Sequence, residues 1–121
     1  MVNETKGLKR LVFATGYSIK GFKSAWIHEE AFRQESVIVA LLLPIGLWIG
    51  NGPIEKCMLV LPLFIILLAE LVNSAIEAAI DRIGPERHEL SGRAKDIGSA
   101  AVFVSLTLAG LIWGIILWGK L

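Results

Sequence analysis

Three long apolar stretches dominate the pattern of hydrophobic and polar positions along the chain. They cover residues 36–54, 57–80 and 98–119, and charged side chains occur only in the last part of the second stretch. A helix of about 20 apolar residues crosses the hydrocarbon core of a bilayer. Pro44 and Pro62 interrupt the first two stretches, but membrane helices tolerate proline. The pattern therefore predicts three transmembrane helices.

Residues 4–34 show a different pattern, typical of a basic amphipathic helix. Mostly apolar positions recur at intervals of three and four, at Leu8, Leu11, Thr15, Ile19, Phe22 and Trp26. Lysine and arginine side chains occupy the other faces. Such a helix lies in the plane of a membrane surface; a soluble docking helix has the same periodicity, but the spans that follow favour the interfacial position. We expect an all-α membrane protein with one domain over 1–121, an N-terminal surface helix and three transmembrane helices.

The distribution of basic residues predicts the orientation of the spans. Six lysines and arginines precede the first span and four lie in the loop 82–97, whereas the other side holds only Lys56 and Lys120. Cytoplasmic segments carry the excess of lysine and arginine. We therefore expect a cytoplasmic N-terminus, a cytoplasmic loop over 82–97, and a C-terminus on the outer side.

The second span changes character near its cytoplasmic end. Polar side chains at offsets 0, 3, 4, 7 and 11 form one face of a helix: Glu70, Asn73, Ser74, Glu77 and Asp81. At 1.5 Å per residue, Glu70 lies about 16 Å deeper than Asp81, and Glu77 about 6 Å deeper. Acidic groups within a span are costly and indicate a function. The alternative is that Glu70 and Glu77 pair with basic residues only to hold a helix bundle together.

Several other residues suggest phosphate and metal chemistry. Glu29 and Glu77 both fall at the cytoplasmic interface, and two carboxylates together with ATP phosphates suit Mg²⁺. In the loop 82–97, Gly84-Pro85 is a helix stop and Ser91 is a candidate cap for the third transmembrane helix. Lys95-Asp96 near that helix start suits a metal-bound nucleotide, although a solvated turn explains these two residues equally well.

Other classes of protein receive little support. Gly16 to Gly21 has the glycine spacing of a Walker A motif, but Phe22 stands in place of the lysine. No cysteine and histidine cluster has zinc spacing, the single Cys57 excludes an internal disulfide, and a net charge of +1 gives no indication of nucleic acid.

Four segments resemble one family. ELVNSAIEAAIDR from Glu70 to Arg82 and HELSGRAKDIGSAA from His88 to Ala101 resemble the signatures of the small integral-membrane diacylglycerol kinases of bacteria. ATGYS from Ala14 and AWIHEEAFRQE from Ala25 are similar too. Together these motifs are specific and extend over nearly the whole chain.

This resemblance implies a homotrimeric bundle in the bacterial inner membrane, with active sites shared between protomers and no nucleic-acid partner. It implies transfer of the ATP γ-phosphate to diacylglycerol, with Mg²⁺. Glu70 would be the general base, supported by Asn73, and Glu29 and Glu77 would hold the metal. Nucleotide positions would be Arg10, Tyr17, Glu29, Glu77, Glu86, His88, Lys95 and Asp96. Lipid-lining or supporting positions would be Arg10, Ser18, Trp26, Arg33, Glu35, Trp48, Glu70, Ser99 and Trp113.

The chain departs from the family pattern at Ile19, where an aromatic residue is usual, and at Arg87, where a tyrosine is usual. Three other interpretations stay open. A related branch of the family resembles undecaprenol kinases. An ion-coupled carrier subunit would use Glu70 and Glu77 as a relay, although spans one and three lack further acids. A structural membrane subunit would use the polar face only to bind a partner.

Overall fold

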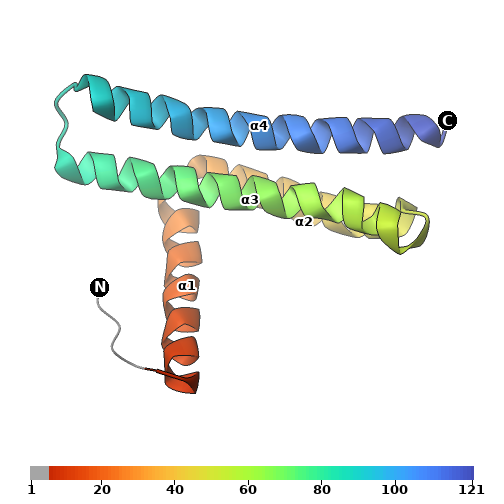
Figure 1. Cartoon of the computed structure of the whole chain (residues 1–121), viewed down its shortest axis with the longest axis horizontal. Coiled ribbons are helices and arrows are strands. Elements are labelled where there is room, and N and C mark those ends of the chain that lie inside the picture. Colours follow the sequence, from red (N-terminus) through yellow and green to blue (C-terminus); the bar gives the residue numbers. More distant parts are fainter. Residues whose placement is uncertain (1–5) are drawn as a thin grey trace.

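The computed structural model describes residues 6–121, which form four α-helices without a β-strand. These are α1 (Leu8–His28), α2 (Glu30–Ile49), α3 (Gly52–Ile83) and α4 (Glu89–Gly119). Helices α2, α3 and α4 run alongside one another, and α1 extends crosswise to them (Figure 1). Helix α3 is central, because it packs on both α2 and α4.

Three of the helices in the described part of the chain are long and apolar enough to cross a membrane. They are α2 with 20 residues, α3 with 32 and α4 with 31. The crosswise α1 has the position of a surface helix relative to these spans (Figure 1). The expected fold class, an all-α membrane protein, is confirmed.

The first helix ends earlier than the pattern over 4–34 indicated, and residues 4 and 5 lie outside the described part. Glu29 has extended backbone angles (φ −116°, ψ 106°) and separates α1 from α2. The carbonyl groups of Trp26 and Ile27 accept hydrogen bonds of 2.7 and 3.1 Å from Arg33 Nη1. Because the last carbonyls of a helix lack partners within it, Arg33 stabilises this corner.

The segment 82–97, expected to be a loop, is largely helical. Helix α3 continues to Ile83 and α4 begins at Glu89, so the connection is only 84–88. Gly84, with φ of +157°, ends α3 as the Gly-Pro signal predicted. His88 rather than Ser91 caps α4, because its Nδ1 atom accepts a hydrogen bond of 3.1 Å from the backbone N–H of Leu90. Both helices thus extend beyond their apolar stretches, since polar residues can continue a helix outside the membrane.

The core lies where α2 and α4 meet the first half of α3. Leu59, Pro62 and Leu63 are fully buried there. A Cβ atom at Gly46 of α2 would lie 3.2 Å from Leu59 Cβ and 3.3 Å from the Trp113 ring. Glycine therefore permits the close approach of α2 to this core.

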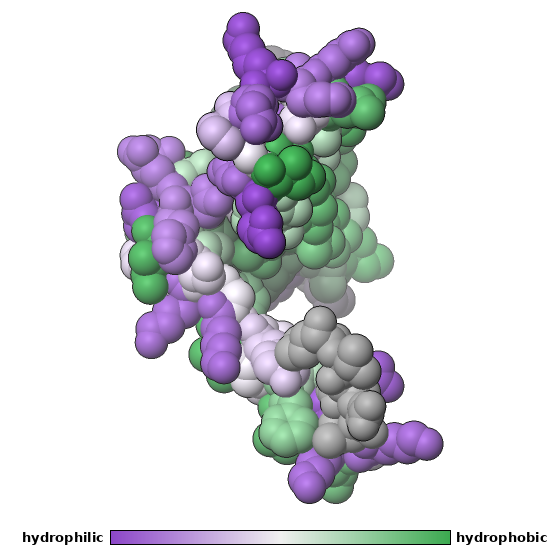
Figure 2. Space-filling model, turned by 90° about the vertical axis from the view of Figure 1, so that its left-hand side faces the viewer, coloured by the Kyte–Doolittle hydropathy of each residue, from purple (hydrophilic) through white to green (hydrophobic). Residues whose placement is uncertain are grey.

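The outer surface separates polar from apolar side chains. Hydrophilic residues gather at the end where α3 joins α4 and along α1, and apolar residues cover the helices behind them (Figure 2). Many large apolar side chains of α2, α3 and α4 are exposed in this single chain. A polar end and an apolar body fit a protein that stands in a bilayer.

Candidate functional site

The polar face of α3 turns inward in the half of the helix that leads to the α3–α4 connection. Glu70 is only 4% exposed, and Asn73 and Ser74 are also buried. Glu77 is half-buried and Asp81 is exposed. The burial of the predicted polar face therefore decreases from Glu70 toward Asp81, and Glu70 has its most buried carboxyl group.

Helix α2 contributes a second carboxyl group to this place. The side chain of Glu35 lies close to the Glu70 side chain, near enough for the two carboxyl groups to interact. The Glu35 Oε2 atom is buried and has no hydrogen-bond partner. A hydrogen bond between two carboxyl groups needs a proton between them, so this pair is suited to holding and moving a proton.

Two further acids surround the pair. Glu77, on the same face of α3, and Glu29, at the corner between α1 and α2, lie near enough for their charges to act on Glu70. The Asn73 amide donates a hydrogen bond of 3.1 Å from Nδ2 to Glu77 Oε1. Asn73 thereby fixes the position of a second carboxylate.

Among the described residues, no basic side chain forms an ion pair with these four acids. Within residues 6–121 the ion pairs are Lys95 with Asp81 and Lys120 with Glu55, both outside the cluster. The alternative in which Glu70 and Glu77 only pair with basic residues therefore has no support in the described part of the chain. Unneutralised carboxylates attract a cation.

The carboxyl groups of the cluster are ligands of the kind that Mg²⁺ accepts when a substrate completes its coordination. No group of three or more His, Cys, Asp or Glu side chains among the described residues could hold a metal by itself. Mg²⁺, however, is usually bound by one or two carboxylates, with substrate phosphates and water completing its octahedron. Glu29 and Glu77 suit this mode, and Asn73 would orient the second ligand.

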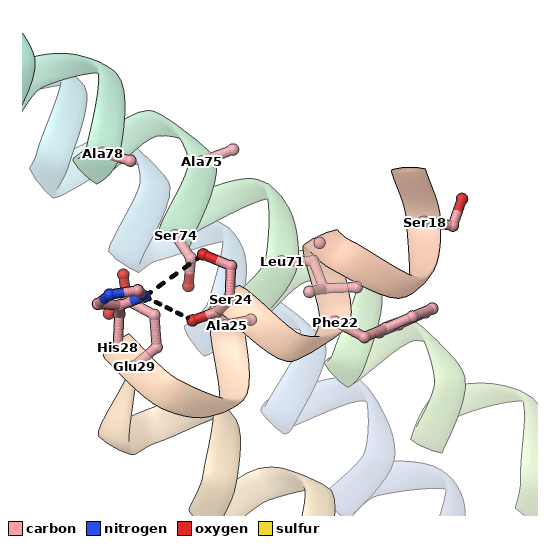
Figure 3. Close-up of a pocket in the computed structure, with 11 residues that line it drawn as sticks. Ser18, Phe22, Ser24, Ala25, His28, Glu29, Leu71, Ser74, Ala75 and Ala78 are labelled. Atoms are coloured by element: carbon pink, nitrogen blue, oxygen red, sulfur yellow. Dashed lines mark hydrogen bonds between the residues drawn. The ribbon is translucent and has the colours of Figure 1, made fainter. Parts of the chain in front are cut away.

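A groove of about 670 Å³ separates α1 from α3. It is lined from α1 by Ser18, Phe22, Ala25 and His28 among others, from the corner by Glu29, and from α3 by Leu71, Ser74, Ala75 and Ala78 (Figure 3). Most of this lining is apolar, and Glu29 brings a charge to it. The groove can therefore hold an apolar molecule beside the acidic cluster.

A more polar cavity of about 620 Å³ lies at the α3–α4 connection. Glu86, His88 and Lys95 line it, as does Arg87. Lys95 Nζ lies 3.0 Å from Asp81 Oδ1, across the two helices. Three of the residues expected to contact a nucleotide thus share one cavity. Its lining combines two cations, Arg87 and Lys95, with the carboxylates of Asp81, Glu86 and Glu89.

Other expected site residues lie apart from these places. Arg10 is in the first turn of α1, at the end remote from α3 and α4 (Figure 1). Tyr17 is exposed on α1, and Trp48 is 84% exposed near the end of α2. Asp96 and Ser99 are exposed on α4. A single chain does not bring these residues to Glu70.

Trp26 and Trp113 have roles within the chain itself. Trp26 contributes its backbone carbonyl to the α1–α2 corner. The Trp113 indole donates a hydrogen bond of 2.9 Å from Nε1 to the carbonyl oxygen of Leu59, and its ring packs near Gly46. Trp113 therefore joins α4 to the core.

Some residues of the site were missed at the sequence level. Ser24 and His28 line the groove, and the His28 ring lies 2.9 Å from the carbonyl oxygen of Ser24. Gly98 touches Asn73 from α4. Single residues of these types carry no signal in a sequence, because their importance depends on which helices become neighbours.

These features define a class of protein: a helical membrane protein with an unneutralised acidic cluster, flanked by an apolar groove and a polar cavity. The model of the prokaryotic diacylglycerol kinase family matches residues 16–117. The chain is 49% identical to a diacylglycerol kinase of Escherichia coli, over 98% of this chain and 97% of that protein. Relatives with the same name from Haemophilus influenzae and Pseudomonas aeruginosa are 46% and 45% identical, over 95% and 93% of this chain and 98% and 92% of their own lengths. The chain belongs to the prokaryotic diacylglycerol kinase family.

Proposed function

We propose that this protein is a lipid kinase that transfers the γ-phosphate of ATP to the primary hydroxyl of diacylglycerol, giving phosphatidic acid. The observation that carries the proposal is the cluster of four carboxyl groups, which has no basic partner within residues 6–121 and lies between an apolar groove and a polar cavity. The relatives are named for this activity. The lipid reaches the cluster from the bilayer side and the nucleotide from the opposite side.

Glu70 acts as the general base. Its carboxylate accepts the proton of the lipid hydroxyl as that oxygen bonds to the γ-phosphorus of ATP. The bond from the γ-phosphorus to the bridging oxygen breaks, and ADP leaves. Phosphoryl transfer needs mainly positioning and charge neutralisation, so few side chains suffice. Burial of Glu70 between α2 and α3 excludes water, which would otherwise compete as acceptor.

Glu29 and Glu77 would hold Mg²⁺ together with the nucleotide. When bound, the metal ion neutralises charge on the phosphates during transfer. Asn73 keeps Glu77 in place through its amide N–H. Glu86, His88 and Lys95 bind the nucleotide in the polar cavity, with Arg10, Tyr17 and Asp96 as further contacts.

The lipid lies along the groove between α1 and α3 and reaches Glu70 with its hydroxyl. Ser18 and Trp26 on α1, with Arg33 and Glu35 on α2, line or support its path. Trp48, Ser99 and Trp113 support it at other depths of the membrane.

A homotrimer completes the site. Arg10, Trp48 and Ser99 lie away from Glu70 within one chain, and the exposed apolar faces of α2, α3 and α4 offer surfaces for neighbouring protomers. The trimer stands in the bacterial inner membrane, with the N-terminus and the α3–α4 connection in the cytoplasm and the C-terminus outside. The excess of basic residues at the N-terminal and connecting segments supports this orientation.

The experiment that tests the function is transfer of labelled γ-phosphate from Mg-ATP to diacylglycerol in mixed micelles. We expect label in phosphatidic acid with the wild-type protein and none with Glu70→Gln. Undecaprenol as a second acceptor tests the related kinase activity in the same assay. Label in undecaprenyl phosphate alone would assign a different lipid. Ion flux into proteoliposomes without ATP, together with no label in either lipid, would overturn the proposed kinase activity.

A further inference from the structure

Helix α4 approaches the polar face of α3 most closely at Gly98. Gly98 is buried, and a Cβ atom built at this position would overlap the Asn73 side-chain oxygen, Oδ1. The Cγ atom of Asn73 would lie 3.3 Å from the same Cβ. The Asn73 amide therefore occupies the space that any side chain at position 98 would need.

The Asn73 amide has two ends with different surroundings. Nδ2 donates the 3.1 Å hydrogen bond to Glu77 Oε1. Oδ1 is buried and has no hydrogen-bond partner. Only the N–H end attracts a carboxylate, so the amide keeps this orientation, and its oxygen must face α4. A buried oxygen without a partner is costly, which indicates that the orientation serves the site rather than stability.

We propose that Gly98 is a positioning residue of the reaction, acting through Asn73 on Glu77. The absent side chain of Gly98 lets the Asn73 amide lie between α3 and α4, where its N–H group holds the Glu77 carboxylate for Mg²⁺ and the nucleotide phosphates. This inference rests on the proposed role of Glu77 as a metal ligand.

The other glycines of α4 show that close packing is a property of position 98. A Cβ atom at Gly92, Gly110 or Gly114 would meet nothing within 4 Å. Alanine is a better helix former than glycine. The close approach of Asn73 explains the glycine at position 98, and no such contact is present at the other three positions. Gly110→Ala is therefore a matched control on the same helix, away from Glu77.

The test measures metal binding apart from turnover. Mn²⁺ is titrated by electron paramagnetic resonance against the purified protein in micelles with β,γ-methylene ATP, which cannot transfer its γ-phosphate. Loss of a residue that orients a metal ligand weakens metal binding by about 10- to 100-fold. We expect this loss for Gly98→Ala and wild-type binding for Gly110→Ala. The KM for the lipid should change little in both variants, and the KM for Mg-ATP should rise in the first only.

A double-mutant cycle separates positioning from general packing. Asn73→Ala removes the side chain that a methyl group at position 98 would overlap, so Gly98→Ala in that background should fold and bind Mn²⁺ within about twofold of Asn73→Ala alone. If Gly98→Ala alone fails to assemble, the comparison of Asn73→Ala with the double variant still shows whether Gly98 acts through Asn73. A further loss in the double variant, or wild-type binding by an assembled Gly98→Ala, would overturn the inference. Glu77→Gln tests the metal role of Glu77 separately from the positioning role of Gly98. Unchanged Mn²⁺ binding by Glu77→Gln would overturn the metal role, and the inference on Gly98 with it.

Discussion

The Glu35 carboxyl group on α2 lies beside the Glu70 carboxyl group on α3, near enough for the two groups to interact. The resemblance to the family implied a lipid-lining or supporting position for Glu35. Its place beside the proposed base gives it a more direct task, because each carboxyl group can hold a proton for the other. We therefore expect Glu35 and Glu70 to act together as one proton-handling unit built from two helices.

Glu35→Gln tests this unit. Glutamine keeps the size of the side chain but cannot take up or release the proton. We expect kcat to fall at least about tenfold, yet less than with loss of the base, since a positioned general base contributes about 10²- to 10⁴-fold. Steady-state kinetics with both substrates varied measures this. An unchanged kcat would leave Glu35 with a lipid-lining role only.

Glu70→Gln should abolish nearly all turnover, with a fall of about 10²- to 10⁴-fold in kcat, because the base is lost. The protein should still assemble, since glutamine fills the same buried space. Phosphate transfer and chemical cross-linking measure the two properties. Glu55→Gln is the matched control, because Glu55 pairs with Lys120, outside the acidic cluster. Near-normal turnover of Glu70→Gln would remove this residue from the base role.

Glu77→Gln should weaken the metal and nucleotide site. Loss of one charged ligand contact is worth about 1.5–3 kcal/mol, which corresponds to about a tenfold to hundredfold rise in the Mg²⁺ concentration needed for half-maximal activity. The KM for diacylglycerol should stay nearly constant. A titration with Mg²⁺ at fixed ATP measures the effect, and an unchanged midpoint would contradict the proposed ligand.

Lys95→Ala should raise the KM for Mg-ATP, because Lys95 is the lysine that lines the polar cavity. Stability should change little. The pair with Asp81 is largely exposed, and such pairs contribute less than about 1 kcal/mol. Comparison of the KM for Mg-ATP with the free energy of unfolding separates the two effects. A stability loss without a KM change would make Lys95 a purely structural residue.

Trp113→Phe should lower the free energy of unfolding by about 1 kcal/mol, the usual contribution of a hydrogen bond between membrane helices. The lost bond joins the indole N–H to the Leu59 carbonyl oxygen. Trp118→Phe is the control, because Trp118 is largely exposed and makes no such bond. Unfolding in micelles with increasing sodium dodecyl sulfate measures both variants; equal stability would assign the Trp113 ring a packing role alone.

The sequence predicted features that depend on one helix at a time. The three spans, the polar face from Glu70 and the stop at Gly84 follow from periodicity and local conformational preference. The contact of Glu35 with Glu70 and that of Gly98 with Asn73 could not be predicted, because they depend on how two helices are registered against each other. The break at Glu29 was missed for a related reason: the 26–33 corner is stabilised by Arg33, whose partners are backbone carbonyls that any sequence has.

The unequal lengths of the spans have a consequence for how the protein depends on its membrane. Helix α2 has 20 residues, about 30 Å of helix, which matches one hydrocarbon core, whereas α3 has 32 residues and α4 has 31. Because α1 runs crosswise at the start of α2 and borders α3 between Leu71 and Ala78, we expect the additional turns of α3 and α4 to extend beyond the hydrocarbon core. A thicker bilayer forces the short α2 into mismatch, which is relieved by tilting or by local thinning of the lipid. With Glu70 as the proposed base, we expect either response to shift its depth relative to the glycerol hydroxyl, and we expect the rate to depend on the thickness of the surrounding bilayer.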